Sequence, residues 1–69
     1  MKLLDVVALT EDMPERHLQC GQVGTIVETL GPGMFEVEFA DLEGRMYASL
    51  AVPEDKLMIL HHGPVEEAA

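Results

Sequence analysis

Residues Met34–Ala40 read MFEVEFA, and apolar and acidic side chains alternate along most of this segment. The side chains at 35, 37 and 39 are apolar, whereas those at 36 and 38 are glutamates. A period of two is typical of a β-strand with one buried face and one solvated face. The segment therefore predicts a strand at the centre of a small sheet.

Two more strands flank this segment. Val23–Leu30 is rich in β-branched residues, which suit a pleated surface better than a helix. The connector Gly31–Gly33 (GPG) cannot continue a helix. On the other side, Asp41–Gly44 (DLEG) predicts a tight turn that leads into a third strand, Arg45–Val52.

The facing of the Arg45–Val52 strand stays undecided from sequence. Met46, Ala48 and Leu50 suggest one inward side, but Tyr47, the largest side chain of the segment, falls on the other side. Apolar residues on both sides are expected where a sheet curls over itself or where its outer face meets a partner.

The two ends of the chain supply the remaining strands. Met1–Leu9 favours a strand, and Thr10–Gln22 predicts a long polar connector in which Pro14 disfavours a helix. After Val52, proline followed by two acids suits a single 3-10 turn. Lys56–Leu60 (KLMIL) is the last predicted strand.

This order predicts an all-β domain at residues 1–60. We expect a five-stranded SH3-like small barrel with a long first loop and a 3-10 turn before the last strand. An OB-type barrel is the alternative, but that fold normally needs a helix where Asp41–Gly44 leaves no room. Residues 61–69 (HHGPVEEAA) are predicted to form a flexible C-terminal tail.

Size and composition bound the function. A chain of 69 residues makes one domain and buries only about 60% of its unfolded surface. Its 48% apolar content is high for so small a core, which predicts a homodimer. The single cysteine, Cys20, excludes an intramolecular disulfide and favours a cytoplasmic location. The longest apolar runs are far shorter than the ~20 residues of a membrane-spanning helix.

The charge balance points to the kind of partner. Thirteen acids and four basic residues give a formal net charge of −9. Binding to nucleic acid or to an anionic membrane relies on clustered Lys and Arg, so neither is expected as a partner. A basic protein surface or a cation suits the negative electrostatic field of the chain better than nucleic acid or an anionic membrane does. The competing interpretation is that the acids only keep a half-apolar domain soluble.

These observations predict a non-enzymatic module that binds another protein. Its binding surface is predicted to include Glu36, Glu38, Tyr47, Arg16 and Leu18. No catalytic residue and no cofactor is predicted, because a thiol in a polar loop has no evident base and orienting group.

A metal-handling accessory domain is the alternative function. His17, Cys20, His61 and His62 are four soft potential ligands, and the first loop and the chain end can meet in an SH3-like barrel. Zinc sites, however, tend to use paired ligands at short spacings, and this chain has one thiolate.

Three segments carry a family resemblance. Leu4–Asp12 (LDVVALTED), Gly21–Glu28 (GQVGTIVE) and Phe35–Phe39 (FEVEF) resemble a bacterial family of domains of unknown function, family 4926. The resemblance covers roughly Leu4 to Leu60 and implies an SH3-like outline, no enzymatic activity and no catalytic residues. It also suggests a partner in a two-gene module, as antitoxins and immunity proteins are.

Gly21–Val27 is also similar to the start of KOW-type SH3-like segments, which bind RNA or proteins. The basic residues that flank RNA-binding examples are missing here. The resemblance therefore favours a KOW-like protein-binding role over an RNA-binding one.

Overall fold

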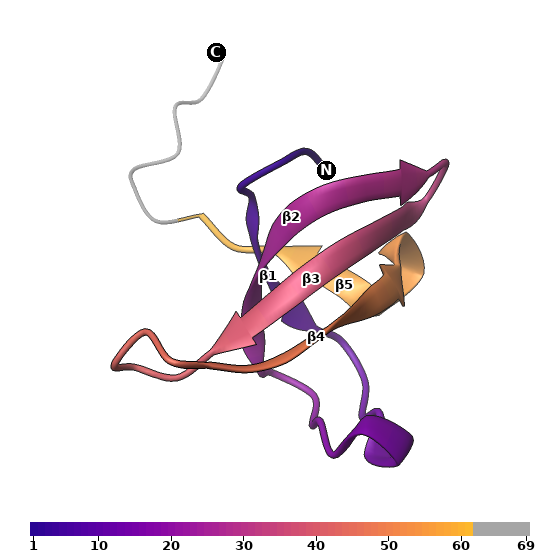
Figure 1. Ribbon diagram of the computed structural model, residues 1–69. Helices are drawn as coiled ribbons and strands as arrows, with labels where there is room; N and C mark the ends of the chain where they lie inside the picture. Colours follow the sequence, from indigo (N-terminus) through magenta and orange to yellow (C-terminus); the bar gives the residue numbers. More distant parts are fainter. Residues whose placement is uncertain (62–69) are drawn as a thin grey trace, which may run out of the picture.

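The computed structural model describes residues 1–61. They form one antiparallel sheet with the strand order β4-β3-β2-β1-β5 (Figure 1). The strands are β1 (Val6–Leu9), β2 (Val23–Gly31), β3 (Met34–Ala40), β4 (Met46–Pro53) and β5 (Leu57–Ile59). Two 3-10 turns are present, η1 (Pro14–Arg16) and η2 (Glu54–Lys56). The structure thus confirms the all-β class, the five strands, the long first loop and the 3-10 turn before the last strand. The predicted tail lies outside the described residues except for His61.

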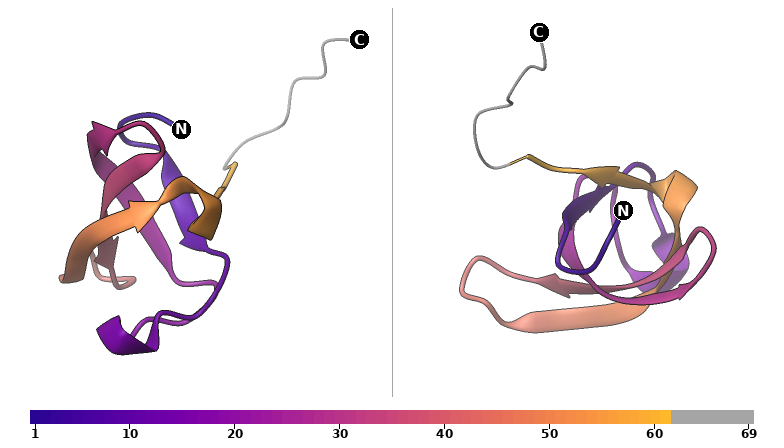
Figure 2. Two further views of the ribbon diagram at one scale, coloured as in Figure 1. Left: turned by 90° about the vertical axis from the view of Figure 1, so that its right-hand side faces the viewer. Right: turned by 90° about the horizontal axis from the view of Figure 1, so that it is seen from above.

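The sheet curls around its core but does not close into a barrel (Figure 2). Within residues 1–61, β4 pairs only with β3, and β5 pairs only with β1. The last strand has only three residues and runs beside β1, so no ladder joins the β5 end of the sheet to β4. The expected closure is therefore wrong for this part of the chain, and the sheet has two edges.

The core lies on the concave side of the sheet, and β3 supplies its centre. Phe35, Val37 and Phe39 are at most 5% exposed, which confirms the alternation predicted for this strand. Each buried side chain removes apolar surface from water, and this is the main term that stabilises so small a domain. The core residues come from every strand and from the first loop: Val7, Leu9, Met13, Leu18, Ile26, Phe35, Val37, Phe39, Leu50, Val52 and Leu57.

The facing of β4 is settled by its register with β3. Leu50 and Val52 lie opposite Val37 and Phe35 and share their inward face. An irregularity between Phe39 and Ala40 shifts the pairing, so Ala40 lies opposite Met46. As a result Met46 is exposed, unlike the inward position that its spacing suggested.

The first loop is anchored to the core. Met13 and Leu18 form an isolated bridge, with the Met13 N–H donating to the Leu18 carbonyl at 2.8 Å and the reverse bond at 3.1 Å. Both side chains are buried, at 7% and 2% exposure. Between them, η1 starts at Pro14, a residue suited to a first helical position. His17 ends the turn in the left-handed region, at φ 58°.

Candidate functional site

Three glutamates gather on the outer face of β2 and β3. Glu28 lies directly opposite Glu36 in the ladder, and Glu38 follows on the same face, opposite Thr25. Directly opposed side chains in an antiparallel pair have Cβ atoms about 4.5–5.5 Å apart. We call Glu28, Glu36 and Glu38 the acidic face, because it concentrates negative charge over two neighbouring strands.

The acidic face continues onto β4 through small side chains. Ser49 lies opposite Glu38, and Ala51 lies opposite Glu36. The Ser49 hydroxyl donates a hydrogen bond to Oε2 of Glu36 at 2.8 Å. The sequence alone leaves the facing of this strand undecided, and the pairing of Ser49 with Glu38 places Ser49 on the outer face.

The basic residues of the domain are engaged elsewhere or lie apart. Arg45 pairs with Asp41 and Glu43 in the β3–β4 turn, and Nζ of Lys56 lies 3.4 Å from Oε1 of Glu11. No ion pair within residues 1–61 involves the acidic face. Its charge is therefore available to a cation from outside the chain.

Tyr47 connects β4 to the first loop. Its side chain is 49% exposed, its ring centre lies 6.5 Å from that of Phe39, and its hydroxyl accepts a hydrogen bond from Nε2 of Gln22 at 2.9 Å. Gln22 in turn lines an open groove of about 610 Å³ along the first loop. The other residues of this groove are Asp12, Pro14, His17, Leu18 and Gln19.

The structure separates the residues predicted for protein binding. Glu36 and Glu38 share the outer face of β3. Tyr47 lies at the register irregularity of β4, where its ring is near the buried Phe39 and its hydroxyl accepts from Gln22. Arg16 is exposed at the end of η1, on the first loop (Figure 1). Leu18 is 2% exposed and packs in the core. Leu18 thus holds the loop in place and offers almost no surface, because burial removes its apolar side chain from water.

The residues predicted for a metal site are not assembled in the described part of the chain. Within residues 1–61, no three His, Cys, Asp or Glu side chains are placed to share an ion. His17, Cys20 and His61 are all exposed, and the Cys20 N–H donates to Oδ1 of Asp12 at 2.8 Å. His62 lies outside the described residues.

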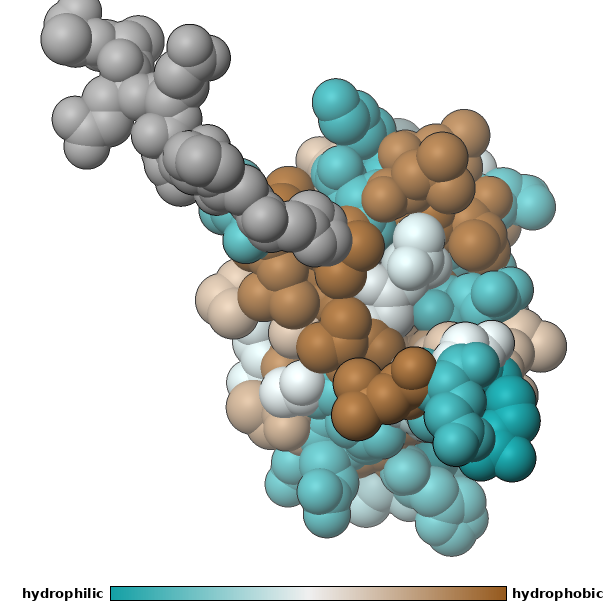
Figure 3. All heavy atoms as spheres, turned by 90° about the vertical axis from the view of Figure 1, so that its left-hand side faces the viewer, coloured by the Kyte–Doolittle hydropathy of each residue, from teal (hydrophilic) through white to brown (hydrophobic). Residues whose placement is uncertain are grey.

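Exposed apolar side chains form a second surface. On the outer side of the sheet, Ala8 of β1 lies between Val23 of β2 and Met58 of β5. Val23 is 44% exposed and Met58 is 53% exposed. Apolar surface extends across the centre of the face shown in Figure 3. Such surface on a small domain is typical of an interface.

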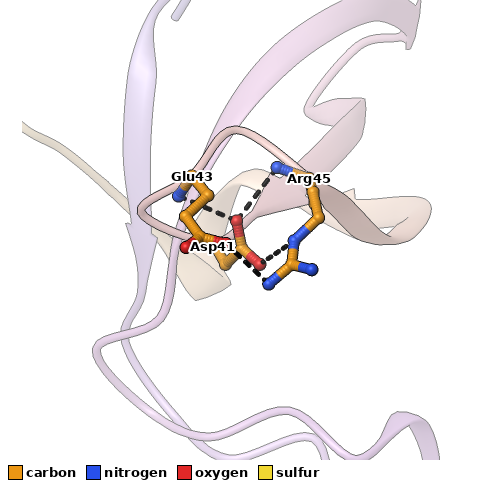
Figure 4. Close-up of polar contacts among 3 residues, drawn as sticks. All are labelled: Asp41, Glu43 and Arg45. Atoms are coloured by element: carbon orange, nitrogen blue, oxygen red, sulfur yellow. Dashed lines mark hydrogen bonds and ion pairs between the residues drawn. The ribbon is translucent and has the colours of Figure 1, made fainter.

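The β3–β4 turn is held by one carboxylate (Figure 4). Oδ1 of Asp41 accepts the N–H groups of Glu43 and Arg45, each at 2.9 Å, and Oδ2 accepts Nε of Arg45 at 3.1 Å. The bond from the Arg45 N–H is the largest cause that lowers the pKa of Asp41 from its ordinary 3.8, against an opposing effect of desolvation. The turn fixes the register at which β4 leaves β3.

One of three comparisons with known proteins identifies the family of this chain. The family model for DUF4926, a domain of unknown function, matches residues 3–59. The chain belongs to this family. The match confirms the resemblance of the LDVVALTED and GQVGTIVE segments, and it covers this chain from β1 to β5, including the acidic face. No curated protein and no solved structure matches the chain.

The helical segments of residues 1–61 are the two single 3-10 turns, and neither has the length or the apolarity that crossing a membrane requires.

Proposed function

We propose that this DUF4926 domain is a non-enzymatic module that binds another protein through its acidic face. The observation that carries the proposal is the direct opposition of Glu28 and Glu36, with Glu38 beside them and no ion pair to any of the three within residues 1–61. Like charges opposite each other destabilise a sheet, and a cationic partner surface relieves that repulsion. The net charge of −9 also attracts basic proteins and speeds their association.

A capture experiment with charge-matched variants tests this proposal. The immobilised protein is compared with Glu36→Gln/Glu38→Gln and with Glu54→Gln/Asp55→Gln, which removes the same charge from the exposed turn η2. We expect the wild type and the η2 variant to retain a basic partner from native lysate, and the acidic-face variant to lose it. Equal recovery by all three proteins removes the acidic face from the proposal.

The protein is also proposed to form a homodimer through the row Val23–Ala8–Met58. The support is the exposure of Val23 and Met58 in a domain with 48% apolar residues. Light scattering on the eluting protein tests it: Met58→Glu should give a monomer. Leu42→Glu, at an exposed turn position outside this row, should leave the dimer intact. A wild type that stays monomeric at high micromolar concentration contradicts this part.

A cytoplasmic location belongs to the same proposal, supported by a single cysteine that is exposed and free. A role as the smaller partner in a two-gene module, like that of an antitoxin or immunity protein, stays a prediction from the family resemblance.

A further inference from the structure

The edge of β4 that faces away from β3 is the longest unpaired strand edge in the described part of the chain. β4 has eight residues, whereas β5, at the opposite end of the sheet, has three. Proteins usually protect an exposed edge with charged side chains, an internal proline or short length. β4 (MYASLAVP) contains no charged residue, and its single proline is the last residue, Pro53.

The register shows which backbone groups this edge presents. The Glu54 N–H donates to the Gly33 carbonyl at 2.9 Å, and the pairs from Met34↔Pro53 to Phe39↔Ala48 continue the same register. In an antiparallel ladder, bonded pairs alternate with pairs whose backbone groups point away. Counting from Glu54, the N–H and C=O groups of Ser49 and Ala51 therefore point away from β3. An added strand would bond to these groups.

We propose that the partner adds an extended segment to the β4 edge and carries lysine or arginine at the two alternate positions opposite Ser49 and Ala51. This inference rests on the proposed function and specifies how the partner reaches the acidic face. Strand addition of this kind draws affinity from backbone hydrogen bonds and specificity from alternate side chains.

The rows of side chains across the sheet determine the chemistry of the added segment. One row runs Glu28–Glu36–Ala51, and the next contains Glu38 and Ser49. An added strand extends both rows and lies about 10 Å from β3, two strand spacings of about 4.8 Å. The short side chains of Ser49 and Ala51 leave room above β4, so a long basic side chain can lie over them and reach the glutamates.

The same rows disfavour a second copy of the chain at this edge. A second β4 would place its own Ser49 and Ala51 on the new strand, and neither of these residues is basic. The acidic face of the second copy would lie on the next strand beyond it. The new strand would then supply no cation to either acidic face. The basic segment is thus the occupant whose charge complements the site.

A short synthetic peptide of alternating lysine and valine is the probe for this inference. It is titrated by calorimetry into wild type, Ala51→Pro, Ala51→Ser and Glu36→Gln/Glu38→Gln. Proline at 51 removes one edge N–H and costs no bond to β3, so the fold tolerates it; Ala51→Ser is the control that keeps the N–H. A second peptide, N-methylated on the backbone edge that faces β4, makes the same test without altering the protein.

We expect at least a tenfold loss of affinity for Ala51→Pro, for the N-methylated peptide and for the acidic-face variant, and little change for Ala51→Ser. The salt dependence of the peptide's affinity should weaken only in the acidic-face variant.

If Ala51→Pro binds the peptide normally and the N-methylated peptide binds wild type normally, while the acidic-face variant does not bind, strand addition is wrong and the proposed function stands. If Ala51→Pro converts a dimer to a monomer, the edge belongs to a second copy and the inference is overturned. No binding of the probe to wild type also overturns it, whatever the lysate experiment recovers.

Discussion

Gly24 lies directly opposite Phe39 in the β2–β3 ladder, and the Phe39 ring covers the position where a side chain at 24 would stand. A Cβ at Gly24 would be 2.7 Å from Cγ1 of Val37, 2.9 Å from the Glu38 carbonyl oxygen and 3.0 Å from Cδ1 of Phe39. The oxygen belongs to the β3 backbone, which cannot withdraw without disturbing the ladder. The glycine thus allows β2 to pass close over the centre of the core.

Gly24→Ala is therefore expected to destabilise the domain. Overpacking costs about 1–3 kcal/mol, which outweighs the ~0.4–1 kcal/mol gained from a less flexible unfolded chain. Urea unfolding followed by circular dichroism measures the difference. Ala40→Val adds carbon to an exposed position of β3 and should change the free energy of unfolding by no more than about 0.5 kcal/mol. Equal stability of Gly24→Ala and wild type would contradict the close approach.

Leu18 tests whether the first loop depends on its apolar anchor. Truncation of a side chain that is 2% exposed should cost about 2–5 kcal/mol in Leu18→Ala, a large share of the stability of a domain this small. Arg16→Ala, two residues away on the exposed side of the loop, should stay within about 0.5 kcal/mol of wild type. Thermal unfolding of both variants provides the measurement. A mild effect at 18 with a strong effect at 16 would reverse the assignment of anchor and surface.

The identity of the strands follows from local sequence, because burial of one face imposes a period of two. The alternation at 35, 37 and 39 locates β3, and the β-branched run locates β2. The 3-10 turn before β5 follows from Pro53 and the acids after it. Glu36 and Glu38 could be placed on an outer face by the same reasoning, whereas the facing of the strand that contains Tyr47 could not be decided.

Features that depend on long-range pairing could not be predicted in this way. The exposure of Met46 arises from the irregularity at Phe39–Ala40, which exists only once β4 has paired with β3. The place of β5 in the sheet depends on its pairing with β1, residues about fifty positions away in the chain. The opposition of Glu28 and Glu36 depends on a register shift after Ile26. Local pattern thus gives the elements, whereas the candidate site arises from their registers.

Tyr47→Phe should loosen the first loop without disturbing the sheet. The substitution removes the hydroxyl that accepts a hydrogen bond from Gln22. An exposed hydrogen bond contributes about 1 kcal/mol or less to stability. The ring can still pack beside Phe39. We expect faster amide hydrogen exchange at Gln19 and Gln22 and unchanged exchange in β3. Ser49→Ala removes a different hydroxyl, which bonds to Glu36 on the outer face, and should leave the loop amides as they are. Unchanged exchange in Tyr47→Phe would show that this bond does not restrain the loop.

The β3–β4 turn should weaken in acid because of Asp41. Its pKa is lowered in the folded protein, chiefly by the N–H of Arg45, so the carboxylate stabilises the turn at pH values above its ordinary 3.8. That contribution disappears as the pH falls through the lowered pKa of the folded state, since protonation removes the negative charge that accepts the hydrogen bonds from Arg45.

NMR titration should show the amide signals of Glu43 and Arg45 moving together below pH 3.8, and Asp41→Asn should abolish this step. Glu54→Gln, which removes an acid from η2, should leave it in place. A transition of the turn amides centred above the ordinary value would mean that the folded state raises this pKa, and would contradict the geometry of Figure 4.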